Sequence, residues 1–153
     1  MGFIPFVRSN VPPACKMIDT TNNMFGYCQN PWKEGRSCGG SSGGEGGLLG
    51  SGCSPFGIGT DIGGSGRVPC EWVGLCSLKH GFRFTRSGNC FYGKYLLGLQ
   101  IKSELTPMTR SVDDLILFCQ YMFDPENYKT IPSYKRDIYI KQSPFDNSTF
   151  ANK

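Results

Sequence analysis

Glycine dominates the stretch from residue 37 to residue 69, SCGGSSGGEGGLLGSGCSPFGIGTDIGGSGRVP, which holds 13 of the 21 glycines in the chain. Glycine allows backbone with positive φ, and it lets main-chain N–H groups approach a bound group because no Cβ stands in the way. Two serine-bearing turns, GGSSGG at 39–44 and DIGGSGR at 61–67, flank an apolar run. This arrangement predicts a site built from two turns on a rigid scaffold.

A flexible linker is the alternative that composition alone favours for a stretch rich in glycine and serine. Five residues of the stretch favour burial, which a solvated linker does not need: Leu48, Leu49, Pro55, Phe56 and Ile58. A phosphate-binding loop has little support either, because the stretch contains neither G-x-x-x-x-G-K-[ST] nor G-x-G-x-x-G. We therefore expect ordered, partly buried structure here.

The residues from Gly40 to Gly44 also match the G-x-S-x-G pattern of the α/β-hydrolases, and Asp61 and His80 follow in the order of that triad. Those folds place several strands and helices between the nucleophile and the histidine, whereas little chain separates Ser42 from His80 here. His80 is the only histidine in the chain. Its expected role is that of a loop residue.

The two turns taken together carry a resemblance to a known family. GGSSGG, followed about two dozen residues after its first serine by G-T-D-I-G-G-S-x-R-x-P, resembles the amidase signature family of serine amidohydrolases. The phrases NPWKEGRSCGGSSGGEGG and SPFGIGTDIGGS are more similar to the eukaryotic fatty-acid amide hydrolases than to the transamidating tRNA-linked subunits. The resemblance implies an α/β fold, with a mixed β-sheet flanked by helices on both faces, of which this chain would supply a fragment.

The resemblance also implies a role for the residues of both turns. Ser65 would be the nucleophile, and Ser41 would be the cis-serine that bridges the nucleophile to a lysine base. The oxyanion hole would be formed by the N–H groups of Ile62, Gly63, Gly64 and Ser65. Four further residues would support the site: Ser42, Thr60, Asp61 and Arg67.

The lysine base of the family lies in a strand upstream of the phrases that match. No lysine precedes Lys16 in this chain, and Lys16 lies in a segment that does not resemble the motif of that lysine. A serine hydroxyl is a poor nucleophile without its base. The chain taken alone is therefore expected to be inactive.

The expected function is hydrolysis of the C–N bond of acyl amides, fatty-acid amides among them, by a Ser-cisSer-Lys mechanism whose lysine is missing from this chain. Two alternatives stay open. One is a non-catalytic amidase remnant or binding module, and the other is an amidotransferase-type amidase with another amide substrate.

Three residues depart from the pattern of the family around the site. Gly66 stands where the family usually has isoleucine, and both Ser77 and Thr106 replace a glycine. These departures predict relaxed packing around the site.

Charge and cysteine content limit the partners. The formal net charge is +4 without a dense basic cluster, so nucleic acid is not an expected partner. The eight cysteines include no C-x-x-C pair, and one histidine cannot complete a Cys₂His₂ site, so reduced thiols and no metal or cofactor are expected. The expected partner is a small-molecule acyl amide substrate, and the oligomeric state is left open.

The chain shows no secretory signal and no apolar run approaching the roughly 20 residues of a transmembrane helix. The expected location is intracellular, either cytoplasmic or peripheral to an internal membrane, with membrane association only through regions outside this chain. The expected domain organisation is a partial amidase signature domain over 1–141, with its core motif at 37–69, and a weakly defined tail over 142–153.

Apolar patterning predicts the secondary structure. Strands are expected at 3–10, 54–59 and 137–141, a polar loop at 19–36, and helices starting near Glu45 and Pro69. A capping box at 111–114 predicts a further helix. Its core face is expected to comprise Val112, Leu115, Ile116, Cys119, Met122 and Phe123.

Overall fold

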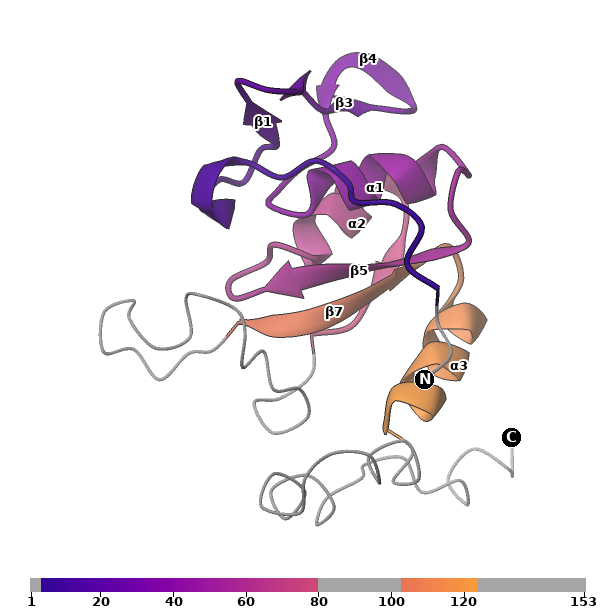
Figure 1. Ribbon diagram of the computed structural model, residues 1–153. Coiled ribbons are helices and arrows are strands. Elements are labelled where there is room, and N and C mark those ends of the chain that lie inside the picture. Colours follow the sequence, from indigo (N-terminus) through magenta and orange to yellow (C-terminus); the bar gives the residue numbers. More distant parts are fainter. Residues whose placement is uncertain (1–3, 80–102, 124–153) are drawn as a thin grey trace.

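A three-stranded antiparallel sheet lies at the centre of the computed structural model, which describes residues 4–79 and 103–123 (Figure 1). The strand order is β5 (Phe56–Asp61), β7 (Glu104–Thr109) and β6 (Cys76–Ser77). β5 and β7 pair along their whole length, from Phe56 opposite Thr109 to Asp61 opposite Glu104. Strand β6 pairs only with Met108 and Thr109. The last residue of β5, Asp61, is also the first residue of the second serine-bearing turn.

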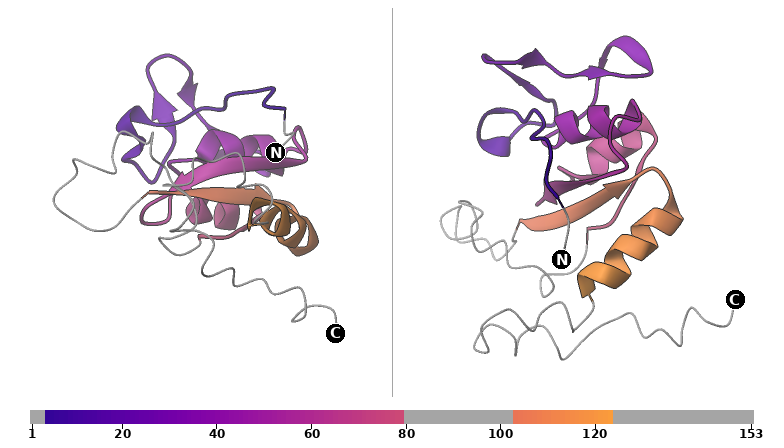
Figure 2. Two further views of the ribbon diagram at one scale, coloured as in Figure 1. Left: turned by 60° about the horizontal axis from the view of Figure 1, so that its bottom comes forward. Right: turned by 45° about the vertical axis from the view of Figure 1, so that its right-hand side comes forward.

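Helices cover both sides of this sheet, as the sequence predicted. Helix α1 (Gly43–Gly50) packs against β5, β7 and helix α2 (Arg67–Val73), while α3 (Val112–Phe123) packs against β7 and β6. In all views α1 and α3 lie on opposite sides of the sheet (Figures 1 and 2). Buried Leu49, Cys70 and Met108 join α1, α2 and β7 in one apolar cluster.

Helix α1 begins two residues before the predicted start at Glu45, directly after Ser42. Its glycines cost helix stability, by about 1 kcal/mol each relative to alanine. Close packing explains why they are tolerated: a Cβ on Gly44 would lie 2.2 Å from the backbone nitrogen of Asn10, and one on Gly46 would lie 3.0 Å from Cβ of Pro69. Glu45 lies in the first turn, where an acidic side chain interacts favourably with the positive end of the helix dipole.

Helix α2 begins at Arg67 rather than near Pro69 and ends at Val73, where Gly74 adopts the left-handed conformation with φ of 74°. Glycine is the usual residue for this type of helix end. The last carbonyls of α2 are hydrogen bonded from outside the helix, because Trp32 Nε1 donates to Val73 O at 2.8 Å and Asn30 Nδ2 donates to Trp72 O at 2.9 Å. These bonds attach the segment before the first serine turn to α2.

The predicted buried strand at 3–10 is wrong for the described part of that segment. Residues 4–10 form no strand, and Ile4 and Phe6 are 85% and 67% exposed. A short 3₁₀ helix η1 (Pro13–Cys15) follows. An apolar run predicts that its side chains are buried, but it does not identify the surface that would cover them. The prediction failed for this reason.

Two short hairpins replace the polar loop predicted at 19–36. The first pairs β1 (Thr21–Asn22) with β2 (Gly26–Tyr27), and the second pairs β3 (Gln29–Asn30) with β4 (Lys33–Ser37). In the first hairpin Asn22 Oδ1 accepts hydrogen bonds from the N–H groups of Met24 and Phe25. Asparagine stabilises turns in this way, so local polar contacts order a segment that composition alone describes as a loop.

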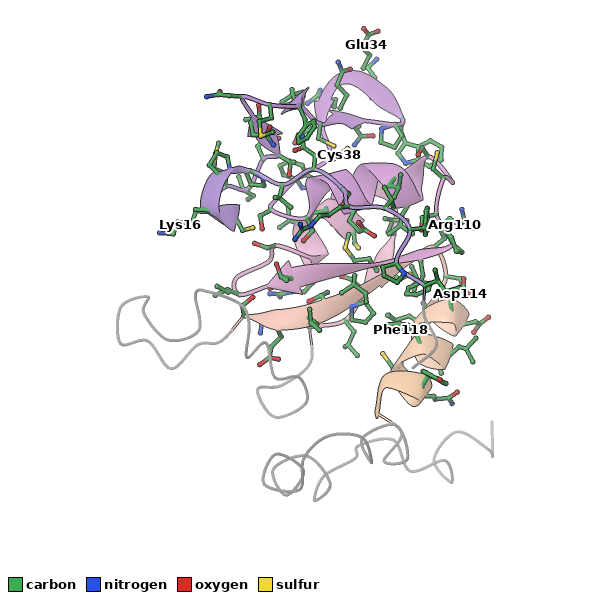
Figure 3. All side chains as sticks on the ribbon, viewed as in Figure 1. Lys16, Glu34, Cys38, Arg110, Asp114 and Phe118 are labelled. Atoms are coloured by element: carbon green, nitrogen blue, oxygen red, sulfur yellow. The ribbon has the colours of Figure 1, made fainter. Side chains whose placement is uncertain are left out.

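The capping box of α3 is present, since the N–H of Asp114 donates to Ser111 Oγ at 3.1 Å and Ser111 Oγ donates to Asp114 Oδ2 at 2.7 Å. The predicted core face is partly wrong, because Val112 is 58% exposed. Phe118 points toward the sheet and stacks against Phe56 with ring centroids 5.0 Å apart (Figure 3).

Several predictions fall on other parts of the chain. His80, the strand at 137–141, the boundary at 141 and the tail at 142–153 all lie outside the described residues. None of the helices in the described ranges has the length and apolar character to cross a bilayer.

Candidate active site

Hydrogen bonds join the two serine-bearing turns, which are far apart in the sequence. The backbone N–H of Ser42 donates to the carbonyl oxygen of Ser65 at 3.0 Å. The side chain of Ser42 also accepts a hydrogen bond from the N–H of Thr60 at 3.2 Å and donates to Thr60 O at 3.4 Å. Ser42 therefore links the first turn to the end of β5 and to the second turn.

The peptide bond between Gly40 and Ser41 is cis. Ser41 is 1% exposed, so this part of the turn is buried. A Cβ on Gly40 would lie 2.6 Å from Met17 O and 2.8 Å from Asp19 N. Only glycine fits at position 40, because the segment around Met17 to Asp19 passes directly over it.

Asp61 organises the second turn. Its carboxylate is fully buried and accepts hydrogen bonds from the N–H groups of Gly64 (2.7 Å), Gly66 (3.2 Å) and Arg67 (3.2 Å). The Arg67 guanidinium adds two more, from Nε at 3.0 Å and from the terminal nitrogen NH2 at 3.1 Å. The structure thus places Asp61 and Arg67 where they fix the shape of the turn.

The charge state of this pair follows from the same contacts. Burial alone would raise the pKa of Asp61, but the hydrogen bonds from the Arg67 side chain and from three backbone N–H groups outweigh it and lower the pKa below its ordinary value. The hydrogen bond to Asp61 raises the pKa of Arg67. The carboxylate is therefore ionised at neutral pH.

The N–H groups predicted to form the oxyanion hole differ in their surroundings. The N–H of Gly64 is engaged by Asp61 Oδ1 at 2.7 Å. Within residues 4–79 and 103–123, the N–H groups of Ile62, Gly63 and Ser65 have no protein acceptor. Three of the four groups thus have no acceptor among the described residues, and the fourth holds the turn in place.

Thr20 holds the first turn, and sequence reasoning missed it. The side chain is fully buried, and its hydroxyl donates to Gly39 O at 2.9 Å and accepts from the N–H of Gly43 at 3.1 Å. Nearby, Ser37 Oγ donates to Asp19 Oδ1 and accepts from the N–H of Gly39 at 2.9 Å. No local signal marks Thr20, since both of its partners are backbone groups of a distant segment.

Replacing Thr20 with valine keeps the shape of the side chain but leaves a buried carbonyl and a buried N–H without a partner. We expect the free energy of unfolding to fall by about 1–3 kcal/mol, measured by urea-induced unfolding. Thr20→Ser keeps the hydroxyl and is expected to retain most of the stability. A Thr20→Val chain as stable as the original would contradict the role of Thr20.

The prediction of relaxed packing around the site is wrong at the pair Gly66 and Thr106. Thr106 is fully buried in β7, and a Cβ on Gly66 would lie 2.7 Å from its Cγ2 and 2.9 Å from its Cβ. The space left by the smaller residue at 66 is therefore filled by the larger residue at 106. The departures at these two positions compensate for each other.

Comparisons with known proteins agree with this geometry. The amidase family model matches residues 1–148. Fatty-acid amide hydrolase 1 of Sus scrofa is 40% identical, over 94% of this chain and 25% of that protein. Fatty acid amide hydrolase 1 of Caenorhabditis elegans is 35% identical, over 100% of this chain and 26% of that protein.

A solved structure of fatty acid amide hydrolase is similar with a TM-score of 0.73 and 28% identity, over 91% of this chain and 24% of that chain. The chain spans about a quarter of the length of the relatives it matches. The α/β arrangement predicted from the sequence is confirmed by this structural similarity. The chain belongs to the amidase family.

Proposed function

We propose that this chain carries the serine-bearing part of an amidase active site that hydrolyses the C–N bond of acyl amides. The observation that supports it most directly is the 3.0 Å hydrogen bond from Ser42 N to Ser65 O, which brings the two serine turns together. Amide hydrolysis needs a nucleophile, a group that moves its proton to the leaving amine, and donors for the oxyanion. The two turns offer candidates for each of these tasks.

Ser65 is the proposed nucleophile, attacking the substrate carbonyl through Oγ. As the carbonyl oxygen gains negative charge, it accepts hydrogen bonds from the N–H groups of Ile62, Gly63 and Ser65, while Asp61 holds the turn that presents them. Loss of one donor of this kind typically lowers the rate by about 10²–10³-fold. The N–H of Gly64 positions the turn through Asp61.

Ser41 is the proposed proton carrier. In this role its hydroxyl takes the proton of Ser65 during attack and passes it to the leaving amine, in contact with a lysine base. Its burial, at 1% exposure, supports the role because proton transfer is protected from bulk water there. The structure places Lys16 at η1, with its side chain pointing outward (Figure 3), so Lys16 is not proposed as the base. The lysine base is proposed to lie outside residues 4–79 and 103–123.

Fatty-acid amides are the proposed substrate class, because relatives that match 94% and 100% of this chain carry that activity in their names. Short aliphatic amides and the glutamine amide of an amidotransferase are the alternatives. Competition between long-chain and short-chain amides separates them, since a fatty-acyl site is inhibited by the long-chain amide at much lower concentration.

The test uses a chimera in which residues 4–123 replace the matching segment of the Sus scrofa hydrolase, so that upstream segments are present. Ser65→Ala is expected to lower kcat by about 10⁴–10⁶-fold, the range seen when a serine nucleophile is removed. Ser51→Ala is the matched control, because Ser51 is exposed and lies at the far end of α1.

Retention of activity by Ser65→Ala would rule out the mechanism. An unmutated chimera that melts cooperatively but does not hydrolyse amides would instead favour the non-catalytic remnant.

A further inference from the structure

Two cysteines face each other at the base of the second hairpin. Gln29 of β3 pairs with Ser37 of β4, so the next step outward places Cys28 opposite Cys38, and the N–H of Cys38 donates to Cys28 O at 3.3 Å. The N–H of Cys28 itself donates to Thr20 O at 2.9 Å, so only one hydrogen bond joins the two backbones. Directly opposed residues in antiparallel strands have Cα atoms about 4.5–5.5 Å apart. That separation lies inside the range of about 4.4–6.8 Å found for disulfides.

The two sulfur atoms also lie on the same side of the hairpin, over helix α1. A Cβ on Gly47 would lie 3.1 Å from Cys38 Sγ and 3.4 Å from Cys28 Sγ, so both sulfurs flank one point on the helix surface. Figure 3 shows Cys38 between the second hairpin and α1. By these two distances the sulfur atoms lie no more than about 6.5 Å apart, on the same face of the hairpin.

The surroundings of the two thiols favour attack by Cys28. A hydrogen bond with Cys38 lowers the pKa of Cys28 below its ordinary value, and the same bond raises the pKa of Cys38. Cys28 is half-buried, whereas Cys38 is buried. Thiolates and not thiols react with oxidants. Cys28 is therefore expected to react first, and Cys38 is the neighbouring thiol that reacts with it afterwards.

Cys70 also has a neighbouring cysteine, since its Sγ donates to the carbonyl oxygen of Cys76 at 3.6 Å. Burial raises the pKa of Cys70 and of Cys119 to about 11, which disfavours their thiolates at neutral pH. Cys15 and Cys53 are exposed, in η1 and after α1.

We propose that Cys28 and Cys38 form a reversible disulfide site that a hydroperoxide oxidises. The Cys28 thiolate attacks one oxygen of the hydroperoxide and the O–O bond breaks, which gives a sulfenic acid on Cys28 and releases water or an alcohol. Cys38 sulfur then attacks Cys28 sulfur, the S–O bond breaks, and the hydroxyl leaves as water with the proton of Cys38. Two thiols lose two electrons in total, and the hydroperoxide gains them.

This bond would close next to the first serine turn. Cys38 directly precedes Gly39, and Cys28 Sγ donates to the carbonyl oxygen of Gly43 at 3.4 Å, at the start of α1. Disulfide formation removes that hydrogen bond and also the one that Cys38 Sγ donates to Gln29 O at 2.7 Å, and it ties the hairpin to the residue before the turn. The inference does not depend on the proposed amidase activity, because it concerns only the two thiols and their oxidant.

The chain itself allows a direct test by peptide mapping. The reduced chain is treated with hydrogen peroxide, alkylated and cut with trypsin without reduction. Lys33 and Arg36 lie between the two cysteines, so trypsin separates the fragment 17–33, which contains only Cys28, from the fragment 37–67, which contains Cys38 and Cys53. The expected product is a cross-link between these two fragments that dithiothreitol separates.

Three controls decide the pairing. Cys53→Ser is expected to keep the cross-link, while Cys38→Ser is expected to abolish it and leave a sulfenic acid on Cys28 that dimedone traps. The Cys28–Cys38 linkage should exceed every other linkage by about tenfold or more in native buffer. In concentrated guanidinium chloride, where loop length alone decides, it should no longer exceed the linkage of Cys70 to Cys76, which lie closer together in the sequence. A cross-link lost in Cys53→Ser, or native pairing as mixed as in denaturant, would overturn the proposal.

Discussion

Replacement of Asp61 with alanine is expected to lower the free energy of unfolding by about 3 kcal/mol or more, because several hydrogen-bond donors lose their acceptor at a cost of roughly 1–3 kcal/mol for each donor that stays buried. The carboxylate is fully buried and accepts five hydrogen bonds, three of them from backbone N–H groups of the second turn. Without it the N–H groups of Gly64 and Gly66, which are buried, have no acceptor, whereas the exposed Arg67 can turn to water. Urea-induced unfolding of the two chains measures the difference.

Arg67→Ala is the matched control for this effect. The Arg67 side chain is 50% exposed, so its loss is expected to cost much less than the loss of Asp61. If Asp61→Ala and Arg67→Ala were equally mild, the carboxylate would not be what holds the turn.

The contribution of Asp61 also depends on pH. Because its folded pKa is lowered, the stabilisation is fully present above the unfolded pKa of about 4. It is lost as the pH falls through the folded pKa. The stability difference between the original chain and Asp61→Ala should therefore shrink below about pH 4.

Gly44→Ala is expected to destabilise the chain by about 3 kcal/mol, at the upper end of the usual cost of overpacking. A Cβ there would lie 2.2 Å from Asn10 N and 2.4 Å from Asn10 O. Backbone atoms cannot rotate away as a side chain can, and the N–H of Gly44 also donates to Asn10 O at 3.0 Å. Helix propensity alone predicts the opposite sign, a gain of about 1 kcal/mol. Thermal unfolding of the two chains distinguishes these outcomes.

Gly63→Ala provides the control, because a Cβ on Gly63 meets no atom within 4 Å. Its effect is expected to stay within about 0.5 kcal/mol, as for other open surface positions. A stabilised Gly44→Ala chain would mean that the contact between α1 and Asn10 does not form.

Elements with a local signal could be predicted from the sequence. The serine and glycine pattern marks the start of α1, and the capping box and apolar spacing mark α3. Strand β7 was missed, because it carries Pro107 in its interior and proline is rare inside sheets. The proline lies just beyond the end of β6, which pairs only with Met108 and Thr109.

The candidate site shows the same limit. Sequence patterns indicated both serine turns, but not the bond from Ser42 to Ser65 that joins them, because that contact is between backbone groups. Thr20 was missed because its hydroxyl bonds to backbone groups of a segment that is distant in the sequence. Side-chain patterns along a chain identify apolar faces and glycine-rich turns. Contacts with backbone groups of distant segments appear only in the folded molecule.

The contact between Gly66 and Thr106 restricts the order in which the two positions can change. A chain that starts with isoleucine at 66 and glycine at 106 would meet a steric clash if threonine appeared at 106 first, since even a single Cβ at 66 lies 2.7 Å from Thr106 Cγ2. Losing the isoleucine first leaves only a cavity, which neighbouring side chains can partly fill. The order in which isoleucine is lost first therefore avoids the clash that the reverse order has to pass through.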